Sequence, residues 1–290
     1  MKDELIEILD SATKIAVLCA DATTAAGQLA RGHLSGPTAS HYLAEALAGV
    51  ALLGAETAQE AETVTFRLDC PGPLEGFLVE CTAAGTLRGY TKKKILNDFD
   101  GLGAPKDVQV LGGSGTFEII RSIPGAILSS GTVATAWKEG AVAAGLDAYF
   151  DQSLQRRVRT AVAASVGDDG VPLFARGLLA ECPPDGDAAA FAQVAAVFAS
   201  GAAARALASG AAARALASGA AAPRTLLKKL GLPQAEIRRT RALSFACRCS
   251  AERAAAMVAA IPPDERAALP PTLDITCHMC GRTWTVTTNP

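Results

Sequence analysis

The sequence predicts an α+β protein with a largely antiparallel sheet and helices, followed by a helical linker and a small C-terminal unit that binds zinc through four cysteines. Three observations lead to this prediction: strand-like alternation in the first half of the chain, helical periodicity around it, and four of the eight cysteines gathered near the C-terminus. We expect an α+β body at residues 1–185, an alanine-rich metastable linker at 186–240 and a four-cysteine zinc unit at 241–290.

The first 60 residues are expected to be helical, since apolar residues recur there at spacings of three and four. Gly36-Pro37 breaks this pattern, and a helical period resumes from Thr38 to Ala55. The apolar residues of the first stretch are Leu5, Ile8, Leu9, Ala12, Ile15, Ala16 and Cys19.

Residues 63–125 predict a meander of antiparallel strands. TVTFRLD alternates apolar and polar residues, and turn residues separate it from GFLVEC and TLRGY, while LGGSGTFEII adds a strand after a glycine-rich turn. We expect a helix over 132–150 and then a hairpin, with strands at 158–165 and 171–181 around the turn at Gly167 to Gly170.

The alanine-rich stretch contains SGAAARALA twice in succession, at 200–208 and 209–217. Nine residues at about 100° each leave an offset of about 180°, so Leu207 and Leu216 fall on opposite helix faces. No continuous apolar stripe forms, and the segment is expected to have little to bury. Two interpretations stay open: a flexible linker, or a segment whose fold depends on its neighbours.

The overall charge and the N-terminus restrict the class of protein. A net charge of −2 and a pI near 6.0 argue against a protein built mainly to bind nucleic acid. The first residues are acidic rather than basic, and no stretch reaches about 18 unbroken apolar residues, so we expect a cytoplasmic location without a membrane. Disulfides rarely persist in that compartment, so paired cysteines indicate metal or redox chemistry.

The four C-terminal cysteines form a C-x-C pair, Cys247 and Cys249, and a C-x-x-C pair, Cys277 and Cys280. Two short thiolate pairs are a common way to build a tetrahedral zinc site. The residues between the pairs offer almost no core, so the unit is expected to need the metal to fold. His278 is a competing ligand within the second pair.

Basic residues surround this motif. Ten Arg or Lys against two acids between Arg205 and Arg253 give +8, since 10 minus 2 is 8. We expect arginines next to the ligands to balance the negative zinc–thiolate cluster, and a disulfide across C-x-C to be strained and easily reduced. These arginines are Arg248 and Arg282, with Arg238, Arg239 and Arg241 just upstream.

The remaining cysteines are predicted to be buried, unreactive thiols: Cys19, Cys70, Cys81 and Cys182. The chain has only three histidines and carries no G-x-S-x-G, P-loop or dinucleotide motif. We therefore expect a protein that is not an enzyme, with no catalytic residues and no cofactor other than zinc.

With these residues placed, the sequence resembles the heat-shock protein 33 family of redox-regulated chaperones over nearly its whole length. The most specific match is the pair of cysteine motifs. ATTAAGQLARGHLSGPTA, GPLEG, TLRGY and AYFDQSLQ support it in the same order. Leu154 stands where the family tends to have an acid, and the alanine repeat is unusual.

The resemblance implies a mechanism. Reduced protein holds zinc through the four cysteines and is inactive, and oxidation forms the disulfides Cys247–Cys249 and Cys277–Cys280 and releases zinc. The tail and linker then unfold, and the protein, often as a homodimer, binds unfolded or oxidatively damaged client proteins without ATP.

Two other functions are weighed against this one. A static zinc-ribbon module would contact nucleic acid or a protein partner through the basic 205–253 segment, although this segment has few aromatic residues for stacking on bases. A thiol oxidoreductase would use Cys277 and Cys280, but such a site normally begins a helix in a βαβ fold.

Overall fold

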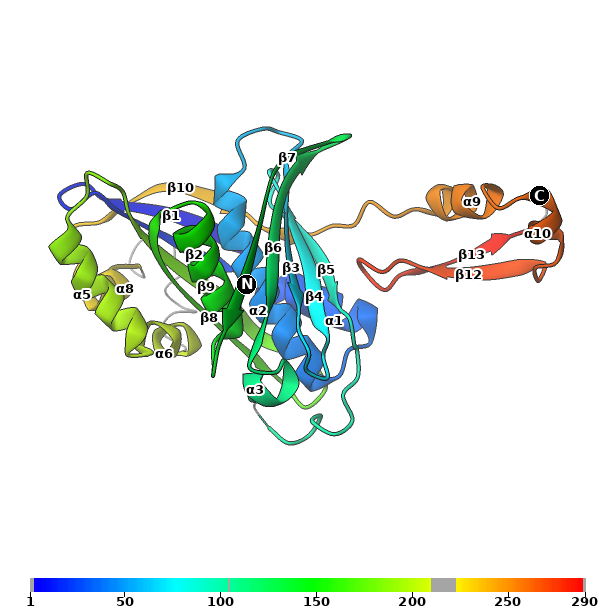
Figure 1. The fold of residues 1–290 in the computed structure, drawn as a ribbon, viewed down its shortest axis with the longest axis horizontal. Coiled ribbons are helices and arrows are strands. Elements are labelled where there is room, and N and C mark those ends of the chain that lie inside the picture. Colours follow the sequence, from blue (N-terminus) through cyan, green and yellow to red (C-terminus); the bar gives the residue numbers. More distant parts are fainter. Residues whose placement is uncertain (1–2, 104, 210–222, 289–290) are drawn as a thin grey trace.

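The computed structural model describes residues 3–103, 105–209 and 223–288. Two antiparallel sheets form the body (Figure 1). The first has five strands in the order β10-β1-β2-β9-β8, and all its neighbours are antiparallel. Its strands are β1 (Glu4–Asp10), β2 (Ile15–Asp21), β8 (Arg157–Val166), β9 (Pro172–Cys182) and β10 (Glu236–Ala242).

The second sheet has six strands in the order β11-β5-β4-β3-β6-β7, antiparallel except where β11 joins β5. Its strands are β3 (Thr63–Asp69), β4 (Gly76–Thr82), β5 (Thr86–Thr91), β6 (Ser114–Ile123), β7 (Ala126–Ala136) and β11 (Ser244–Phe245). The meander and the later hairpin expected from the sequence are therefore confirmed, as is the α+β class.

The main core lies between the two sheets. Helix α2 (Pro37–Leu53) contacts strands of both sheets and is buried on nearly every side, so alanine and leucine fill its whole circumference. Pro37 starts this helix after Gly36, one residue before the predicted start at Thr38. The shorter helices of the body are α1 (Thr23–His33), η1 (Gly54–Glu56), α3 (Asp107–Val110), α4 (Ala141–Ala148) and the π-helical turn η2 (Tyr149–Ser153).

Two helix predictions are wrong. Residues 4–21 form a hairpin, β1 and β2, because the apolar residues there also fit a period of two: Leu5 faces the main core, whereas Ile6 and Ile8 face the opposite side of the sheet. Residues 132–136 belong to strand β7, and the helix predicted at 132–150 begins only at Ala141.

The linker covers the outer face of the five-stranded sheet through α5 (Ala188–Ala199), α6 (Ala202–Ala208) and α8 (Pro223–Lys229). We call this second apolar layer the outer cluster; it joins Ile6, Ile8, Ile15, Val17 and Leu178 of the strands to Phe191, Val194, Leu207, Leu227 and Leu230 of the linker. The expectation that the stretch has little to bury is wrong for this described part. Leu216 and most of the second repeat lie outside the described residues.

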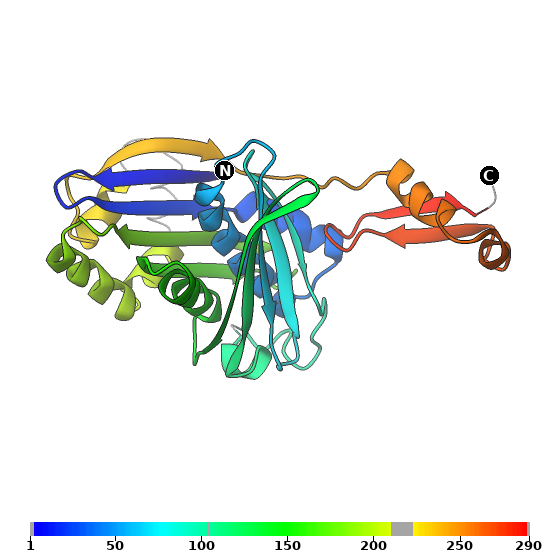
Figure 2. The same cartoon turned by 45° about the horizontal axis from the view of Figure 1, so that its top comes forward.

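The cysteine unit projects from the body (Figures 1 and 2). It consists of α9 (Ala251–Ala259), α10 (Pro263–Ala267) and the hairpin β12 (Thr272–Thr276) and β13 (Thr283–Thr287). Its own core has only three buried residues, Ala254, Val258 and Val286. Within the part of the chain that the structure describes, no single helix is long and apolar enough to span a membrane; the bent pair α5 and α6 meets the length and composition criteria together.

Candidate metal centre

The two cysteine motifs are held by different local structures. Cys247 and Cys249 lie on the extended segment between β11 and α9. Ser250, which follows Cys249, caps the N-terminus of α9. Cys277 and Cys280 lie in the turn between β12 and β13, where the amide of Gly281 donates to the carbonyl of Cys277 at 2.8 Å. Gly281 has a φ of 72°, a left-handed conformation that glycine adopts without strain.

The structure brings all four predicted ligands together. Their sulfur atoms lie within 4.8 Å of one another; Cys247 Sγ is 3.7 Å from Cys277 Sγ, and Cys249 Sγ is 3.5 Å from Cys280 Sγ. Zn–S bonds of about 2.3 Å in a tetrahedron place sulfurs about 3.8 Å apart, whereas a disulfide requires about 2.0 Å. The four free thiols are therefore close enough to hold one metal ion.

The pKa values of the four thiols differ with their surroundings. Burial raises the pKa of Cys277, and of Cys280 further. At Cys247 burial opposes the charged form, but hydrogen bonds from the Cys249 amide and the neighbouring thiols outweigh it and lower the pKa to about 7. One thiolate thus forms readily, but four together require a metal to offset their repulsion.

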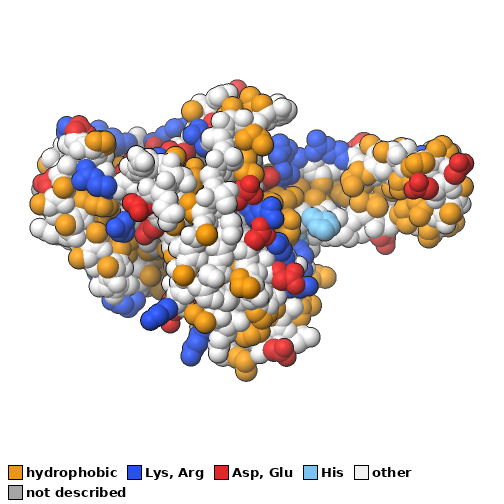
Figure 3. Space-filling model, viewed as in Figure 1, with side chains coloured by type: hydrophobic (Ala, Val, Ile, Leu, Met, Phe, Trp, Pro, Cys, Tyr) orange, Lys and Arg blue, Asp and Glu red, His pale blue; other side chains and the backbone are white. Residues whose placement is uncertain are grey.

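Positive charge reaches the site from the body, from residues that sequence reasoning missed. The Arg88 guanidinium lies 4.0 Å from Cys247 Sγ and also binds Glu80. Lys94 Nζ lies 2.5 Å from His33 Nδ1. Burial lowers the pKa of Lys94 to about 8, while the nearby Cys277 and Cys280 oppose that shift. Lysine and arginine side chains are seen at the neck between body and tail in Figure 3.

The arginines expected to balance the thiolates make other contacts. Arg248 lies 3.8 Å from Glu80, and Arg282 stacks over the Trp284 ring. Arg238 binds Ser11 and Arg241 binds the carbonyl of Gly54, so these two contact the body instead. The motif TLRGY contains Arg88 and matches the family, but nothing in this local pattern places the Arg88 side chain beside the cysteines.

The cysteine unit packs directly on the body beside β5 and the end of α1. The amide of Gly89 donates to the carbonyl of Met279 at 3.1 Å, and the Tyr90 ring meets the His278 ring edge-on. A Cβ on Gly32 would lie 2.6 Å from the carbonyl oxygen of Cys280, so only glycine fits there. His278 therefore packs against the body, and it does not belong to the group of clustered ligands.

Comparison with known proteins identifies this arrangement. The model of the Hsp33 protein family matches residues 3–287, nearly the whole chain. The chain belongs to the Hsp33 family. Two curated relatives are named 33 kDa chaperonin: one from Symbiobacterium thermophilum, 26% identical over 97% of this chain and 93% of its own, and one from Thermus thermophilus, 27% identical over 92% and 79%.

A solved structure supports the fold. The crystal structure of the 33 kDa chaperonin (heat shock protein 33 homolog) from Thermotoga maritima superposes with a TM-score of 0.78 at 17% identity, covering 99% of this chain and 96% of that one. The protein is thus an Hsp33-family chaperone with a cluster of four cysteines that could hold a metal ion.

The other cysteines of this Hsp33-family chain lie in the two apolar layers. Cys19, Cys81 and Cys182 are buried, as predicted, and burial raises the pKa of both Cys19 and Cys81 to about 12. Cys70 is only half-buried, and burial raises its pKa as well. The raised pKa keeps the thiols of Cys19, Cys70 and Cys81 protonated and slow to oxidise.

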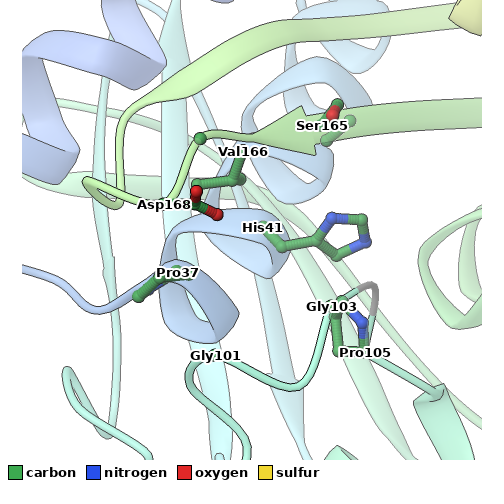
Figure 4. A pocket seen from close by; sticks show the side chains of 10 residues that line it. Pro37, His41, Gly101, Gly103, Pro105, Ser165, Val166 and Asp168 are labelled. Carbon is green, nitrogen blue, oxygen red and sulfur yellow. The ribbon is translucent and has the colours of Figure 1, made fainter.

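A pocket of about 480 Å³ lies between α2, the loop around Gly103 and the turn between β8 and β9 (Figure 4). His41 lines it and lies 3.6 Å from the Glu45 carboxylate, and burial lowers the pKa of the imidazole. No cysteine lines this pocket. His41 thus serves as a packed partner of a buried acid.

Proposed function

We propose that this chain is a redox-switched holdase that works without ATP. In the reduced form, Cys247, Cys249, Cys277 and Cys280 hold one zinc ion and the protein is inactive. Oxidation converts them to the disulfides Cys247–Cys249 and Cys277–Cys280. Formation of each disulfide removes two electrons from two thiolates, and an oxidant such as hypochlorous acid accepts them together with one proton and is reduced to chloride and water.

The observation that carries this proposal is the position of the thiol cluster. It cross-links a tail whose own core has three buried residues, and such a small unit unfolds when its metal is removed. Cys247 follows β11 by a single residue, and β11 follows β10 closely. Loss of zinc therefore releases the tail next to the last strands of both body sheets.

The outer cluster supplies the surface that activation would uncover. Ile6, Ile8, Val17 and Leu178 lie on the five-stranded sheet beneath the linker helices and are almost fully buried. If the linker unfolds with the tail, a continuous apolar sheet face becomes accessible. An exposed face of this kind binds the apolar segments that unfolding proteins present.

We also propose a cellular location, an oligomeric state and a class of client for this protein. We place the protein in the cytoplasm, where reducing conditions keep the thiols on zinc until oxidative stress, and expect the active form to be a homodimer. Clients would be unfolded or oxidatively damaged proteins, whereas membranes and nucleic acid would not be partners.

The test is light scattering from a chemically unfolded reporter protein diluted into buffer. Reduced, zinc-loaded protein is compared with hypochlorite-treated protein, and zinc release is followed with a chromogenic chelator. The proposal predicts suppression of aggregation only after oxidation. A Cys70→Ser variant is expected to respond as the wild type does. Equal behaviour of the two forms would show that the site is a static brace and would contradict the proposal.

A further inference from the structure

Strand β10 occupies the edge of the five-stranded sheet and connects the linker to the cysteine unit. It pairs antiparallel with β1, from Glu4 opposite Ala242 to Leu9 opposite Glu236 (Figure 2). No other described strand lies beyond it in the sheet order. Departure of β10 would therefore convert β1 into the open edge of the sheet.

β10 buries little of itself. Of its seven residues only Arg241 is partly buried, so pairing rests mainly on backbone hydrogen bonds to β1. Anchors flank it: Leu232 in the outer cluster, and Leu243 in the main core with β11 and the cysteines after it. Unfolding of linker and tail would leave Leu243 as the one apolar anchor of β10, beside the hydrogen bonds of Arg238 and Arg241 to the body, to hold an exposed strand against its chain entropy.

The two strands are complementary in charge. β1 carries three acids, Glu4, Glu7 and Asp10, whereas β10 carries three arginines and one acid, Glu236, so its net charge is positive. Arg241 approaches Glu7 to 4.0 Å, and Arg239 lies opposite Glu7 in the register. The arginines are Arg238, Arg239 and Arg241.

The apolar side of β1 offers a second element of recognition. Ile6 and Ile8 point into the outer cluster, where the exposed residues Thr240 and Ile237 lie opposite them in β10. A strand with apolar residues at these two positions would cover the isoleucines once the linker has left. The vacated edge thus favours segments that alternate basic and apolar residues.

We propose that the β1 edge, vacated by β10 on activation, binds an extended basic-apolar segment of the client as a new antiparallel strand. The inference rests on the proposed function and adds its mode of recognition. Main-chain hydrogen bonds then supply binding that does not depend on the client sequence. The acids and isoleucines of β1 add a preference for segments that alternate basic and apolar residues.

The first test uses a fluorescein-labelled peptide with the sequence of residues 235–243, AEIRRTRAL. Fluorescence anisotropy is expected to show binding to the oxidised protein at least about tenfold tighter than to the reduced protein. A control peptide with all three arginines replaced by glutamate is expected to bind weakly, and unfolded reporter protein is expected to displace the first peptide. Equal binding to both redox forms, or equal binding of both peptides, overturns the inference.

The second test fixes β10 in place. Leu243 donates its amide proton to Asp3, so the next pair, Glu4 and Ala242, is a non-hydrogen-bonded pair, whose closer side chains suit a disulfide. The variant combines Glu4→Cys with Ala242→Cys, and Glu4→Ser with Ala242→Ser is the matched control. Mass spectrometry of protease fragments verifies the new bond and the two proposed native ones.

After oxidation both variants are expected to release zinc equally, but the locked variant is expected to lose peptide binding and to hold clients several-fold less well than the serine control. Equal client holding by both variants overturns the inference and leaves the proposed function intact. If the lock abolishes only dimerisation, the edge belongs to a second copy of the chain, which also overturns it. Because both variants lack Glu4, wild-type protein serves as the reference for the proposed function: wild-type protein that releases zinc on oxidation but holds no client shows that the proposed function has failed.

Discussion

The two apolar layers of this molecule are built on opposite faces of the same five-stranded sheet, yet they are secured differently. The main core is enclosed by two sheets around α2, and its residues come from nearly the whole body. Within the described residues, the outer cluster is covered by short linker helices that lead to the tail with the four clustered cysteines. The main core is thus closed by packing within the body, whereas the cover of the outer cluster is connected to the tail.

Under the proposed function, this difference would let one sheet serve both as the scaffold of the body and as the surface that activation uncovers. Ile6 and Ile8 are nearly as well buried as Leu5, their neighbour on the opposite face. Burial in the intact fold therefore does not reveal which layer can open. What distinguishes them is whether the cover is held by further layers of the body or by a cluster of four thiols.

The largest expected effect follows from removing one ligand. Cys280→Ser leaves three thiolates, and a structural zinc site contributes about 10–16 kcal/mol of folding free energy. The tail is expected to unfold while the body stays folded. Trp284 fluorescence reports the tail and that of Trp137 the body, since the chain has only these two tryptophans. Cys70→Ser is the control, and an intact tail in Cys280→Ser would contradict a metal-dependent fold.

A matched pair of leucines compares the two layers directly. Leu47 in the main core and Leu230 in the outer cluster are both almost fully buried, so replacing either with alanine is expected to cost about 2–5 kcal/mol. Leu47→Ala should destabilise the body to urea but leave the reduced form inactive. Leu230→Ala should loosen the linker and raise aggregation suppression by the reduced, zinc-loaded form. The same reduced-state activity in both variants would contradict a distinct role for the outer cluster.

The sequence was most informative where a single pattern excluded the alternatives. Alternation in TVTFRLD and the break at Gly36-Pro37 placed β3 and α2 correctly. Residues 4–21 were misassigned because their apolar residues satisfy both a helical and a strand period. Only the second sheet face, buried by the distant linker, decides between the two.

The site shows the same limit. Cysteine spacing suffices to predict the thiol cluster, because both motifs are local. The contacts of the cluster with Arg88, Lys94 and Gly32 join residues more than 150 positions apart, and no local pattern contains them. The arginines adjacent in sequence were a poor guide, since Arg238 and Arg241 turn toward the body.

The body and the tail are expected to respond to pH in opposite senses. Burial raises the pKa of Asp147 to about 6, against hydrogen bonds from Thr160 that favour the carboxylate. The folded body therefore binds more protons than the unfolded chain between about pH 4 and 6. This extra proton binding stabilises the folded body by about 3 kcal/mol. The stabilisation is complete below the pKa of Asp147 in the unfolded chain and is lost as pH rises through 6. Zinc affinity instead rises with pH, since thiols must lose protons to bind.

The measurement is urea unfolding followed by Trp137 fluorescence in a Trp284→Phe background, at pH 4 and pH 8. Asp147→Asn removes the titrating group and keeps an oxygen acceptor for Thr160. The stability difference between the Asp147 protein and the Asn variant is expected to shift by about 2.4 kcal/mol between the two pH values, to the disadvantage of Asp147 at pH 8. A difference that does not change with pH would contradict the role assigned to this carboxyl group.

The smallest expected effect concerns the contact through which the body holds the tail. Gly32→Ala would place a Cβ 2.6 Å from the Cys280 carbonyl oxygen, so the tail must shift on α1 although the four ligands are unchanged. Because docking and zinc binding stabilise the same state, a docking loss of about 1–2 kcal/mol lowers zinc affinity by about 5- to 30-fold. Competition with a chelator measures the zinc affinity.

Gly27→Ala is the control within the same helix. Its Cβ meets neighbours at an ordinary 3.7 Å, and both variants gain the same helix propensity. Equal zinc affinity in the two variants would mean that the tail holds its metal independently of the body, and the thiol cluster would then have no energetic connection to the sheets through this contact.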